Sequence, residues 1–484
     1  MHDLIVLGDL HLGRGRNPET GRFHGLEAFF YDDDFRRFCA WLCADAGARA
    51  ARLRLVFAGD VFDLLRIEPD QARPGASAAE RRFGPPMSPA RAAALVASIL
   101  GGHPGFVDGV AAVLQAGHEV VFLPGNHDAE LQWAPVQAEV RRALLDAAPD
   151  AGERLRFEPW FHHEPGRIWI EHGSQYDPEG AFRFPLRQGL PEGDPEVERD
   201  MPLGNFFQRY LYNAFGPITF IVPSSTANAR YLRWLILHRP RFLARVALSH
   251  APFVRQLLKR LARAPGGRGE LRRTHESELA ALAARSGLAD RLYAVDALKE
   301  VRGDIHQTLR QIGRNVLAFT GVALFLALLG VGVWFAGFQT IHSLRLGFGS
   351  KTLLFLLLNL LMLAIGAAGV AALLLRGPRA APSTLPRAAR RIVKTLDVPL
   401  VAFGHSHDED VRRLERPAGG PAWYFNTGTW IQVFMRDVLL PRERLQFTFL
   451  CVRGSEGELL HWSPGRGQPV PVILLDDDPH AAAG

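Results

Sequence analysis

The sequence predicts an α/β fold that a largely helical insertion divides into two parts. Five short apolar runs of β-forming residues lie along the 484-residue chain, and each is followed by a glycine-containing patch rich in Asp, Asn or His. Apolar residues make up 48% of the chain, enough for a substantial core. We expect one split α/β domain over 1–200 and 377–484, a helical insertion over 201–314, and two apolar helices within 315–376.

The five apolar runs are predicted to be buried strands. Each patch follows its run at once, so it lies where a strand runs out into a loop, and the polar side chains are expected to converge at one edge of a sheet. Residues 423–430 and 446–453 have the composition of late strands that return to the sheet. The five runs are Leu4–Leu7, Leu53–Phe57, Val120–Leu123, Ile168–Ile170 and Leu400–Phe403.

The polar patches carry residue types that bind metals. Asp9 and His11 are two residues apart, as are His405 and His407, so in an extended segment both side chains of a pair point to the same side. Carboxylate, amide and imidazole donors together suit Mn, Fe, Zn or Ni. The three cysteines have no zinc-ligand spacing. The patches contribute Asp9, His11, Asp60, Asp63, Asn126, His127, Asp128, His172, His405 and His407.

In their order along the chain, the five patches resemble the metal motifs of the calcineurin-like metallophosphoesterase family. The resemblance covers the chain to about residue 177 and again from about residue 398. It implies a four-layer β-sandwich of mixed sheets flanked by helices, and metal-dependent hydrolysis of a phosphate ester or pyrophosphate. It also implies two divalent metal ions, Mn, Fe or Zn, the first held by Asp9, His11 and His407 and the second by Asn126, His172 and His405, with Asp60 bridging both.

The same resemblance implies the residues that handle protons. His127 directly follows Asn126 and resembles the family's general acid, which protonates or stabilises the departing oxygen. Asp128 is expected to orient the imidazole of His127, and Asp63 to support the site without binding metal. In such sites two cations about 4 Å apart clamp the phosphoryl group and activate a water.

Two uncharged runs, Asn315–Phe338 and Thr352–Leu375, separate the fourth patch from the fifth. Each exceeds the roughly 20 residues that cross a bilayer, so we predict a transmembrane hairpin, with two buried core helices as the alternative. Arginines flank the pair more densely than they occupy its connecting turn. The positive-inside rule therefore puts both parts of the α/β domain in the cytoplasm, on the cell inner membrane.

Three further segments have less specific patterns. Asn205–Arg263 mixes large apolar residues with arginine, which fits an amphipathic helix on an anionic membrane surface and helices packed on the domain equally well. Thr274–Arg314 carries mixed charges and is expected to form a solvated stalk. Arg66–Pro89 follows the bridging aspartate and is expected to cap the site.

A net charge of +6 suits an anionic partner, either nucleic acid or membrane lipid. The arginines concentrate around the membrane-like segments, so membrane lipids are expected rather than a stable nucleic-acid partner, and no protein partner is identifiable. Membrane attachment favours a phosphorylated small-molecule or lipid-linked substrate. The bacterial UDP-2,3-diacylglucosamine diphosphatases are similar in motif order, although they typically carry Arg at the position of His127. The alternatives are a phosphodiesterase of nucleotides or nucleic acid, and a catalytically silent membrane-anchored scaffold.

Overall fold

The computed structural model describes residues 2–66, 75–84, 86–186, 200–215, 269–300, 328–375, 384–434 and 443–472, with short pieces at 220–221, 241 and 255–256. These residues form an α/β structure with two mixed β-sheets, which confirms the predicted class. All five predicted strands are present, each within one residue of its expected limits.

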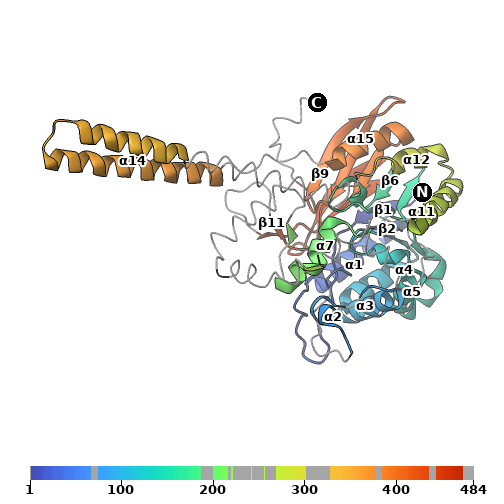
Figure 1. Cartoon of the computed structure of the whole chain (residues 1–484). Helices are drawn as coiled ribbons and strands as arrows, with labels where there is room; N and C mark the ends of the chain where they lie inside the picture. Colours follow the sequence, from blue (N-terminus) through green and yellow to red (C-terminus); the bar gives the residue numbers. More distant parts are fainter. Residues whose placement is uncertain are drawn as a thin grey trace.

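The first sheet has seven strands and joins the two ends of the chain (Figure 1). β1 lies in its middle, parallel to β2 and antiparallel to β13, so that Leu4 pairs with Val452. The strands from β1 to β4 run parallel, because helices connect them. In spatial order the strands are β15 (Gln468–Pro471), β14 (Glu456–Ser463), β13 (Thr448–Arg453), β1 (Asp3–Leu7), β2 (Leu53–Ala58), β3 (Glu119–Leu123) and β4 (Leu155–Phe157).

The second sheet also combines the two parts of the chain. Its central strands β6, β8 and β10 run parallel, and β5 and β9 close its edges in the antiparallel direction. β6 precedes the insertion and β8 follows it, with Ile168 paired to Leu400. In spatial order the strands are β5 (Phe161–Glu164), β6 (Ile168–Glu171), β8 (Leu400–Phe403), β10 (Pro421–Thr427) and β9 (Glu409–Glu415).

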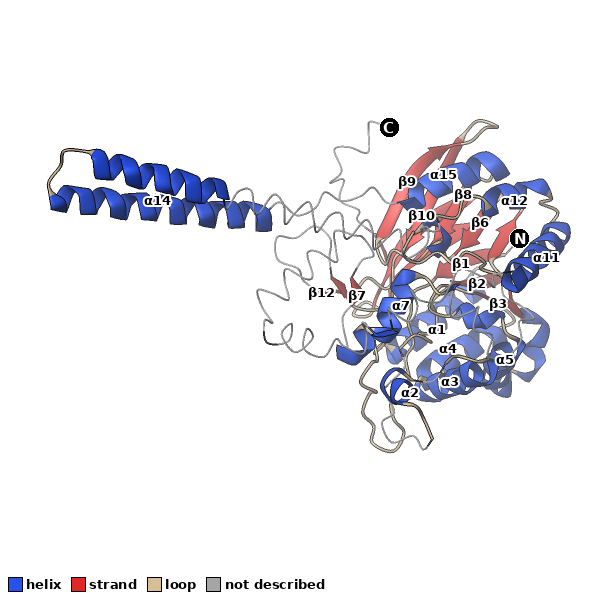
Figure 2. Ribbon diagram, in the orientation of Figure 1, coloured by secondary structure: helices blue, strands red, loops and turns tan. Residues whose placement is uncertain are grey.

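The two sheets pack face to face, and helices cover both outer faces (Figure 2). Alternate residues of β1 point to opposite sides: Leu4 and Val6 lie in the core between the sheets, whereas Ile5 and Leu7 lie under the helices. The layers are therefore helix, sheet, sheet, helix. The first sheet is covered by α1 (Asp32–Ala48), α3 (Pro89–Gly102), α4 (Pro104–Gln115) and α5 (Ala134–Ala147), and the second by α11 (Gly269–Ser286), α12 (Asp290–Asp296) and α15 (Thr384–Leu396).

The position of α11 and α12 corrects one prediction. Thr274–Arg314 is expected from its charges to be a solvated stalk, but Leu279, Leu282 and Leu292 are buried in the core of the second sheet. Apolar residues at helical spacing lie among the charged residues, and this apolar face packs against the second sheet. The stalk prediction is wrong for these helices, and residues 301–314 lie outside the described part of the chain.

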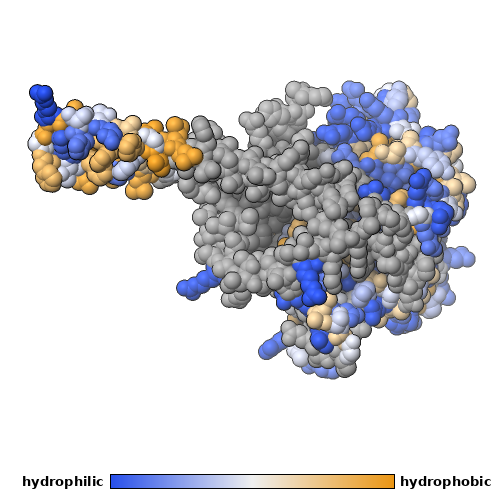
Figure 3. Space-filling model, viewed as in Figure 1, coloured by the Kyte–Doolittle hydropathy of each residue, from blue (hydrophilic) through white to orange (hydrophobic). Residues whose placement is uncertain are grey.

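Two apolar helices form an antiparallel pair that extends away from the sheets (Figures 1 and 3). One covers residues 328–343 and the other is α14 (Phe348–Leu375). Trp334 Nε1 donates to Asn359 Oδ1 at 3.3 Å, and the Trp334 ring packs against Phe355. The described residues thus contain a pair of helices over part of the predicted hairpin, while residues 315–327 of its first run lie outside them.

α14 is the one described helix that is by itself long and apolar enough to cross a membrane, over Phe348–Gly366, and none of that stretch is buried. α3 and α4 reach the same threshold only as a pair bent by 91°, and they pack in the core under the first sheet. A buried-core position, the alternative for the second apolar run, is therefore excluded for the part of α14 whose side chains are described.

Smaller elements surround the site. From the expected cap, α2 (Ala78–Phe83) is described, while 67–74 and 85 are outside the described residues. From Asn205–Arg263 only 205–215 and the short pieces are described, which leaves its membrane-surface alternative outside them. The remaining elements are η1 (Ala129–Gln132), η2 (Pro149–Arg154), η3 (Ser174–Tyr176), α7 (Leu203–Tyr210), η4 (Tyr212–Phe215), and a small sheet of β7 (Phe220–Ile221), β11 (Val433–Phe434) and β12 (Glu443–Arg444).

Candidate metal centre

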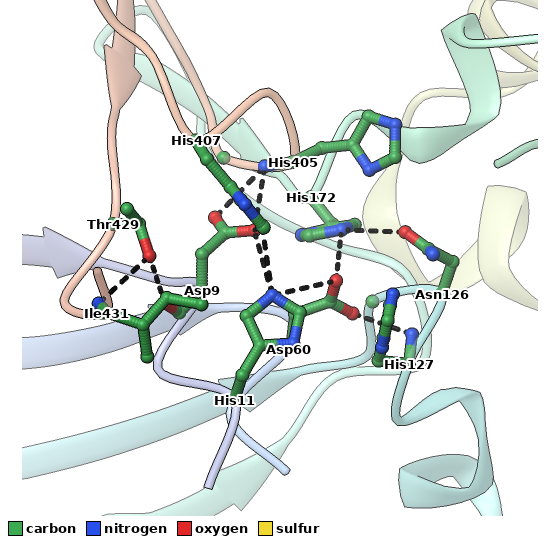
Figure 4. A network of polar contacts seen from close by, with 12 residues as sticks. Asp9, His11, Asp60, Asn126, His127, His172, His405, His407, Thr429 and Ile431 are labelled. Atoms are coloured by element: carbon green, nitrogen blue, oxygen red, sulfur yellow. Dashed lines mark hydrogen bonds and ion pairs between the residues drawn. The ribbon is translucent and has the colours of Figure 1, made fainter. Parts of the chain in front are cut away.

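The five polar patches meet between the two sheets rather than at one edge of a single sheet, as the sequence had suggested. Three patches follow β1, β2 and β3 of the first sheet, and two follow β6 and β8 of the second. Backbone hydrogen bonds tie the loops together, from Asp9 N to Gly59 O at 3.1 Å and from Gly404 N to His172 O at 3.0 Å. The seven predicted metal ligands therefore share one buried site (Figure 4).

Asp9, His11 and His407 form a first group. The two Nε2 atoms of His11 and His407 lie 2.9 Å apart, and they lie 3.9 and 3.1 Å, respectively, from Asp9 Oδ1. At most one of the facing nitrogens can carry a proton, because the other must accept. Two imidazole nitrogens and a carboxylate oxygen directed at one buried point are a donor set that suits a divalent transition metal.

Asp60 lies between this first group and a second one. Its Oδ2 is 3.7 Å from His11 Nε2 and 3.2 Å from His172 Nε2. His172 Nε2 is also 3.1 Å from Asn126 Oδ1. His172 Nδ1 donates to the carbonyl of Ala58 at 2.9 Å, which leaves Nε2 as the ligand atom. Asp60 therefore belongs to two of the groups of side chains that could hold a metal ion.

His405 reaches the second group from the other sheet. One of its ring nitrogens lies within 4.8 Å of the ligand atoms of Asp60 and His172. Its Nε2 pairs with Asp177 Oδ2 at 2.9 Å, and its ring points away from the first group (Figure 4). Its backbone N–H donates to both carboxylate oxygens of Asp9, at 3.1 and 2.9 Å. His405 thus steadies a ligand of the first group through its backbone.

The backbone of the ligand residues is unusual. Nine non-glycine residues in the described part of the chain have positive φ, and five of them are Asp9, His11, Asp60, His405 and His407, with φ of 55°, 47°, 51°, 68° and 54°. Each such residue costs roughly 1–3 kcal/mol and persists where surrounding structure holds it. The extended segments expected at Asp9–His11 and His405–His407 are therefore wrong: left-handed turns, not strand alternation, direct the paired side chains.

The charges in this buried site favour a cation. Burial raises the pKa of Asp60, but His172 and His127 lower it well below its usual value, so the carboxylate is ionised. Burial lowers the pKa of His172, but Asp60 raises it to about 10. A positive charge is therefore stabilised at His172 Nε2, where oxygens of Asp60 and Asn126 meet.

Two glycines let the carboxylates approach their loops closely. A Cβ atom on Gly125 would overlap Asp60 Oδ1, and one on Gly404 would overlap Asp9 Oδ2. Only glycine leaves the carboxylates in these positions. Together with the donor types and the charge balance, this close packing is compatible with a bound metal ion.

His127 lies beside the ligands and is the most exposed of the group, with 12% of its side chain accessible. Its backbone N–H donates to Asp60 Oδ1 at 2.7 Å, and its Nδ1 donates to Asp63 Oδ1 at 3.0 Å. Burial lowers the pKa of His127, but Asp63 and then Asp60 raise it above its ordinary value. Asp63 also lies 2.9 Å from Arg66 Nε, which holds the carboxylate in place.

Asp128 does not have the predicted orienting role. Its carboxylate accepts backbone hydrogen bonds from Asp60, Val61, Phe62 and Gly125, at 3.1, 2.8, 3.2 and 2.6 Å. These contacts join the second patch to the third. The prediction that Asp128 orients His127 is therefore wrong, because the bend at Asn126 and His127 directs Asp128 toward backbone donors, and Asp63 pairs with His127 instead.

Three supporting side chains carry no motif signal in the sequence. Thr429 Oγ1 donates to the carbonyl of Asp9 at 2.5 Å, and Gln446 Nε2 donates to the carbonyl of His407 at 3.0 Å. Asn205, from the insertion, hydrogen-bonds Asn126. Each lies far along the chain from its partner, so only the folded structure reveals the pairing. No protein-family model matches this chain, and no curated protein matches it.

Proposed function

We propose that this chain is a dinuclear metal-dependent phosphoesterase with the calcineurin-like fold, and that it hydrolyses a phosphate ester or pyrophosphate. One observation carries the proposal: Asp60 lies between two buried ligand groups, 3.7 Å from His11 and 3.2 Å from His172, with His127 beside them. The four-layer order of helices and sheets agrees with it. The family and the number of metals are parts of the proposal.

The proposed ligands divide into two sets around Asp60. Asp9, His11 and His407 hold one ion, and Asn126, His172 and His405 hold the other. Two divalent cations in such a pair of sites polarise a phosphoryl oxygen and make a water nucleophilic at neutral pH. Mn, Fe or Zn suits this mixture of oxygen and nitrogen donors.

His127 is the proposed general acid. Nδ1 is occupied by Asp63, so Nε2 is the atom that gives its proton to the departing oxygen. Asp63, and after it Asp60, raise the pKa of His127, which favours the protonated ring. The side chain is more exposed than those of the metal ligands, which suits a residue that meets substrate. Asp63 orients the ring and balances its charge.

We also propose that the hairpin made by the helix at 328–343 and α14 crosses the cell inner membrane twice, which returns the chain to the cytoplasmic side, where both parts of the α/β domain lie. We propose in addition that the substrate is membrane-associated or lipid-linked. The leucines of α14 are exposed, for example Leu361 at 56%. After α14, the outer face of α15 exposes Arg390, Arg391 and Lys394, which fits a surface of anionic lipids.

An alkaline wash of membranes tests the membrane anchor: the protein should stay in the pellet, and its release into the wash would refute the proposal. Leu361→Arg should weaken retention, since the charge costs about 2.5–3.5 kcal/mol at mid-membrane.

Hydrolysis by detergent-purified protein loaded in turn with Mn²⁺, Fe²⁺ or Zn²⁺ tests the catalytic proposal. The substrates are a generic phosphomonoester, a generic phosphodiester and a UDP-linked diacyl sugar. Asp60→Asn and His127→Ala should abolish or severely lower turnover, whereas His163→Ala, which changes a histidine outside the site, should not. Turnover of the lipid-linked substrate alone supports the membrane substrate. Turnover of only the generic esters keeps the catalytic proposal and refutes the lipid-linked substrate, and no turnover with any metal refutes the enzyme.

A further inference from the structure

A segment of the insertion reaches into the metal centre. α7 places Asn205 against Asn126, 79 residues earlier in the chain, and both side chains are buried. Asn126 Nδ2 donates to Asn205 Oδ1 at 3.1 Å, and Asn205 Nδ2 donates to the backbone carbonyl of Asn126 at 2.7 Å. The two amides therefore form a reciprocal pair.

The oxygen and NH₂ ends of the two side-chain amides can be assigned in only one way. A backbone carbonyl accepts and never donates, so the Asn205 atom that faces it must be the NH₂ group. The other end of the Asn205 amide is then its oxygen, which requires the NH₂ group of Asn126 opposite it. Asn126 Oδ1 is left to face His172 Nε2 at 3.1 Å. A turned Asn126 amide would instead direct two N–H donors at the point where a cation binds.

The same segment touches a second ligand loop. Asn213, in η4, donates from Nδ2 to the carbonyl of Leu65 at 2.7 Å, just beyond the patch that holds Asp60 and Asp63. Two asparagines thus tie residues 205–213 to the loops after β2 and β3. Only Asn205 contacts a proposed metal ligand in these bonds, so its removal should have the larger effect on metal binding.

We propose that Asn205 is a positioning residue that sets the orientation of the Asn126 amide and so completes the second metal site. The inference rests on the proposed function in one respect, namely that Asn126 Oδ1 is a metal ligand. It assigns to the insertion a direct part in building the site. Loss of a residue that orients a metal ligand typically lowers metal affinity about 10- to 100-fold. We expect a loss of about that size, for one of two ions, when Asn205 no longer holds the Asn126 amide.

Two substitutions of Asn205 separate positioning from packing. Asn205→Leu has a similar size and removes both hydrogen bonds, so the Asn126 amide can turn. Asn205→Asp keeps an oxygen acceptor for Asn126 Nδ2 but sets a second oxygen against the Asn126 carbonyl. It should lower the stability of the metal-free protein yet keep the ligand amide in place. Gln208→Ala changes another amide on α7, one that pairs with Asn213, and is the matched control.

The measurement is Mn²⁺ and Zn²⁺ binding to the full-length, detergent-purified chain by titration against a chelator, with thermal melting in EDTA. Asn205→Leu should lose about 10- to 100-fold in affinity at one of two sites, while Asn205→Asp and Gln208→Ala lose less than about tenfold. Equal affinities in Asn205→Leu and wild type would overturn the inference. An equal loss in both Asn205 variants, tracking their melting temperatures, would also overturn it. Wild type that binds no metal would instead refute the proposed function.

Discussion

Replacing Asp63 with asparagine tests which carboxylate holds His127. Asparagine keeps the size of the side chain and removes its charge, so His127 Nδ1 keeps an acceptor but loses its anionic partner. Hydrogen bonds to charged partners contribute about 1.5–3 kcal/mol and neutral ones about 0.5–1.5 kcal/mol. A loss of about 1–2 kcal/mol in the transition state lowers kcat roughly 5- to 30-fold.

The assay compares two aryl phosphates that differ in leaving group. A general acid matters most when the leaving oxygen is basic, so the loss in Asp63→Asn should be larger for a phenyl than for a nitrophenyl ester. Metal content is measured in parallel, because Asp63 also faces His11 Nδ1 at 3.4 Å. The rate is then expressed per loaded site.

Asp128→Asn is the matched control, since both variants neutralise one buried carboxylate. Asp128 accepts four backbone hydrogen bonds. The asparagine of the variant would direct its NH₂ group at backbone N–H donors, at a cost of about 1–3 kcal/mol per unpaired group. The variant should melt at a lower temperature and lose activity equally with both esters. A loss that depends on the leaving group in Asp128→Asn, but not in Asp63→Asn, would refute the assignment of Asp63.

Two further predictions concern stability and metal binding. Burial lowers the pKa of His103, but Asp32 and Glu27 raise it to about 9, against about 6.5 when unfolded. The folded protein then binds the proton of His103 more tightly than the unfolded chain does. The contribution of His103 to the free energy of unfolding should therefore be fully present below about pH 6.5 and be lost, on the order of 3 kcal/mol, as pH rises through about 9. Urea unfolding across this range checks it: His103→Gln should flatten the curve, and an unchanged slope would contradict the reasoning. Gly404→Ala places a methyl group on the Asp9 carboxylate, and we expect about a 10- to 100-fold loss in affinity at the first metal site, with unchanged affinity as the contrary result.

Local patterns in the sequence predict the strands well, and they single out the seven residues that meet in one buried site. Leu4–Leu7 and Leu400–Phe403 are strands because short runs of β-forming residues end at turn-forming patches, a signal contained within ten residues. Such patterns carry no information on pairing. That β1 pairs with β13, and that the patches meet between two sheets, depends on contacts more than 390 residues apart, such as the one from His405 N to Asp9.

The errors have physical causes of the same kind. Asp128 adjoins His127 in the sequence, but the bend at Asn126 and His127 directs its carboxylate to backbone N–H donors. Asn205 has no motif around it and acquires its role only through docking of α7. For α11, counting charges hid the apolar stripe that packs against the second sheet. Side-chain direction and docking follow from tertiary structure, which single-sequence patterns do not record.

The pairing of β1 with β13 has a consequence for how the protein is made. Leu4 pairs with Val452, so β1 lacks one neighbouring strand for roughly 20–90 s after its synthesis, at ribosomal speeds of about 5–20 residues per second. β6 likewise lacks its neighbour β8 until β8 has been synthesised. His405 and His407 are synthesised after the other five proposed ligands. A chain released early carries five of the seven ligands and no closed centre. The candidate metal centre can therefore be complete only after the apolar hairpin has been synthesised and the final strands have closed both sheets.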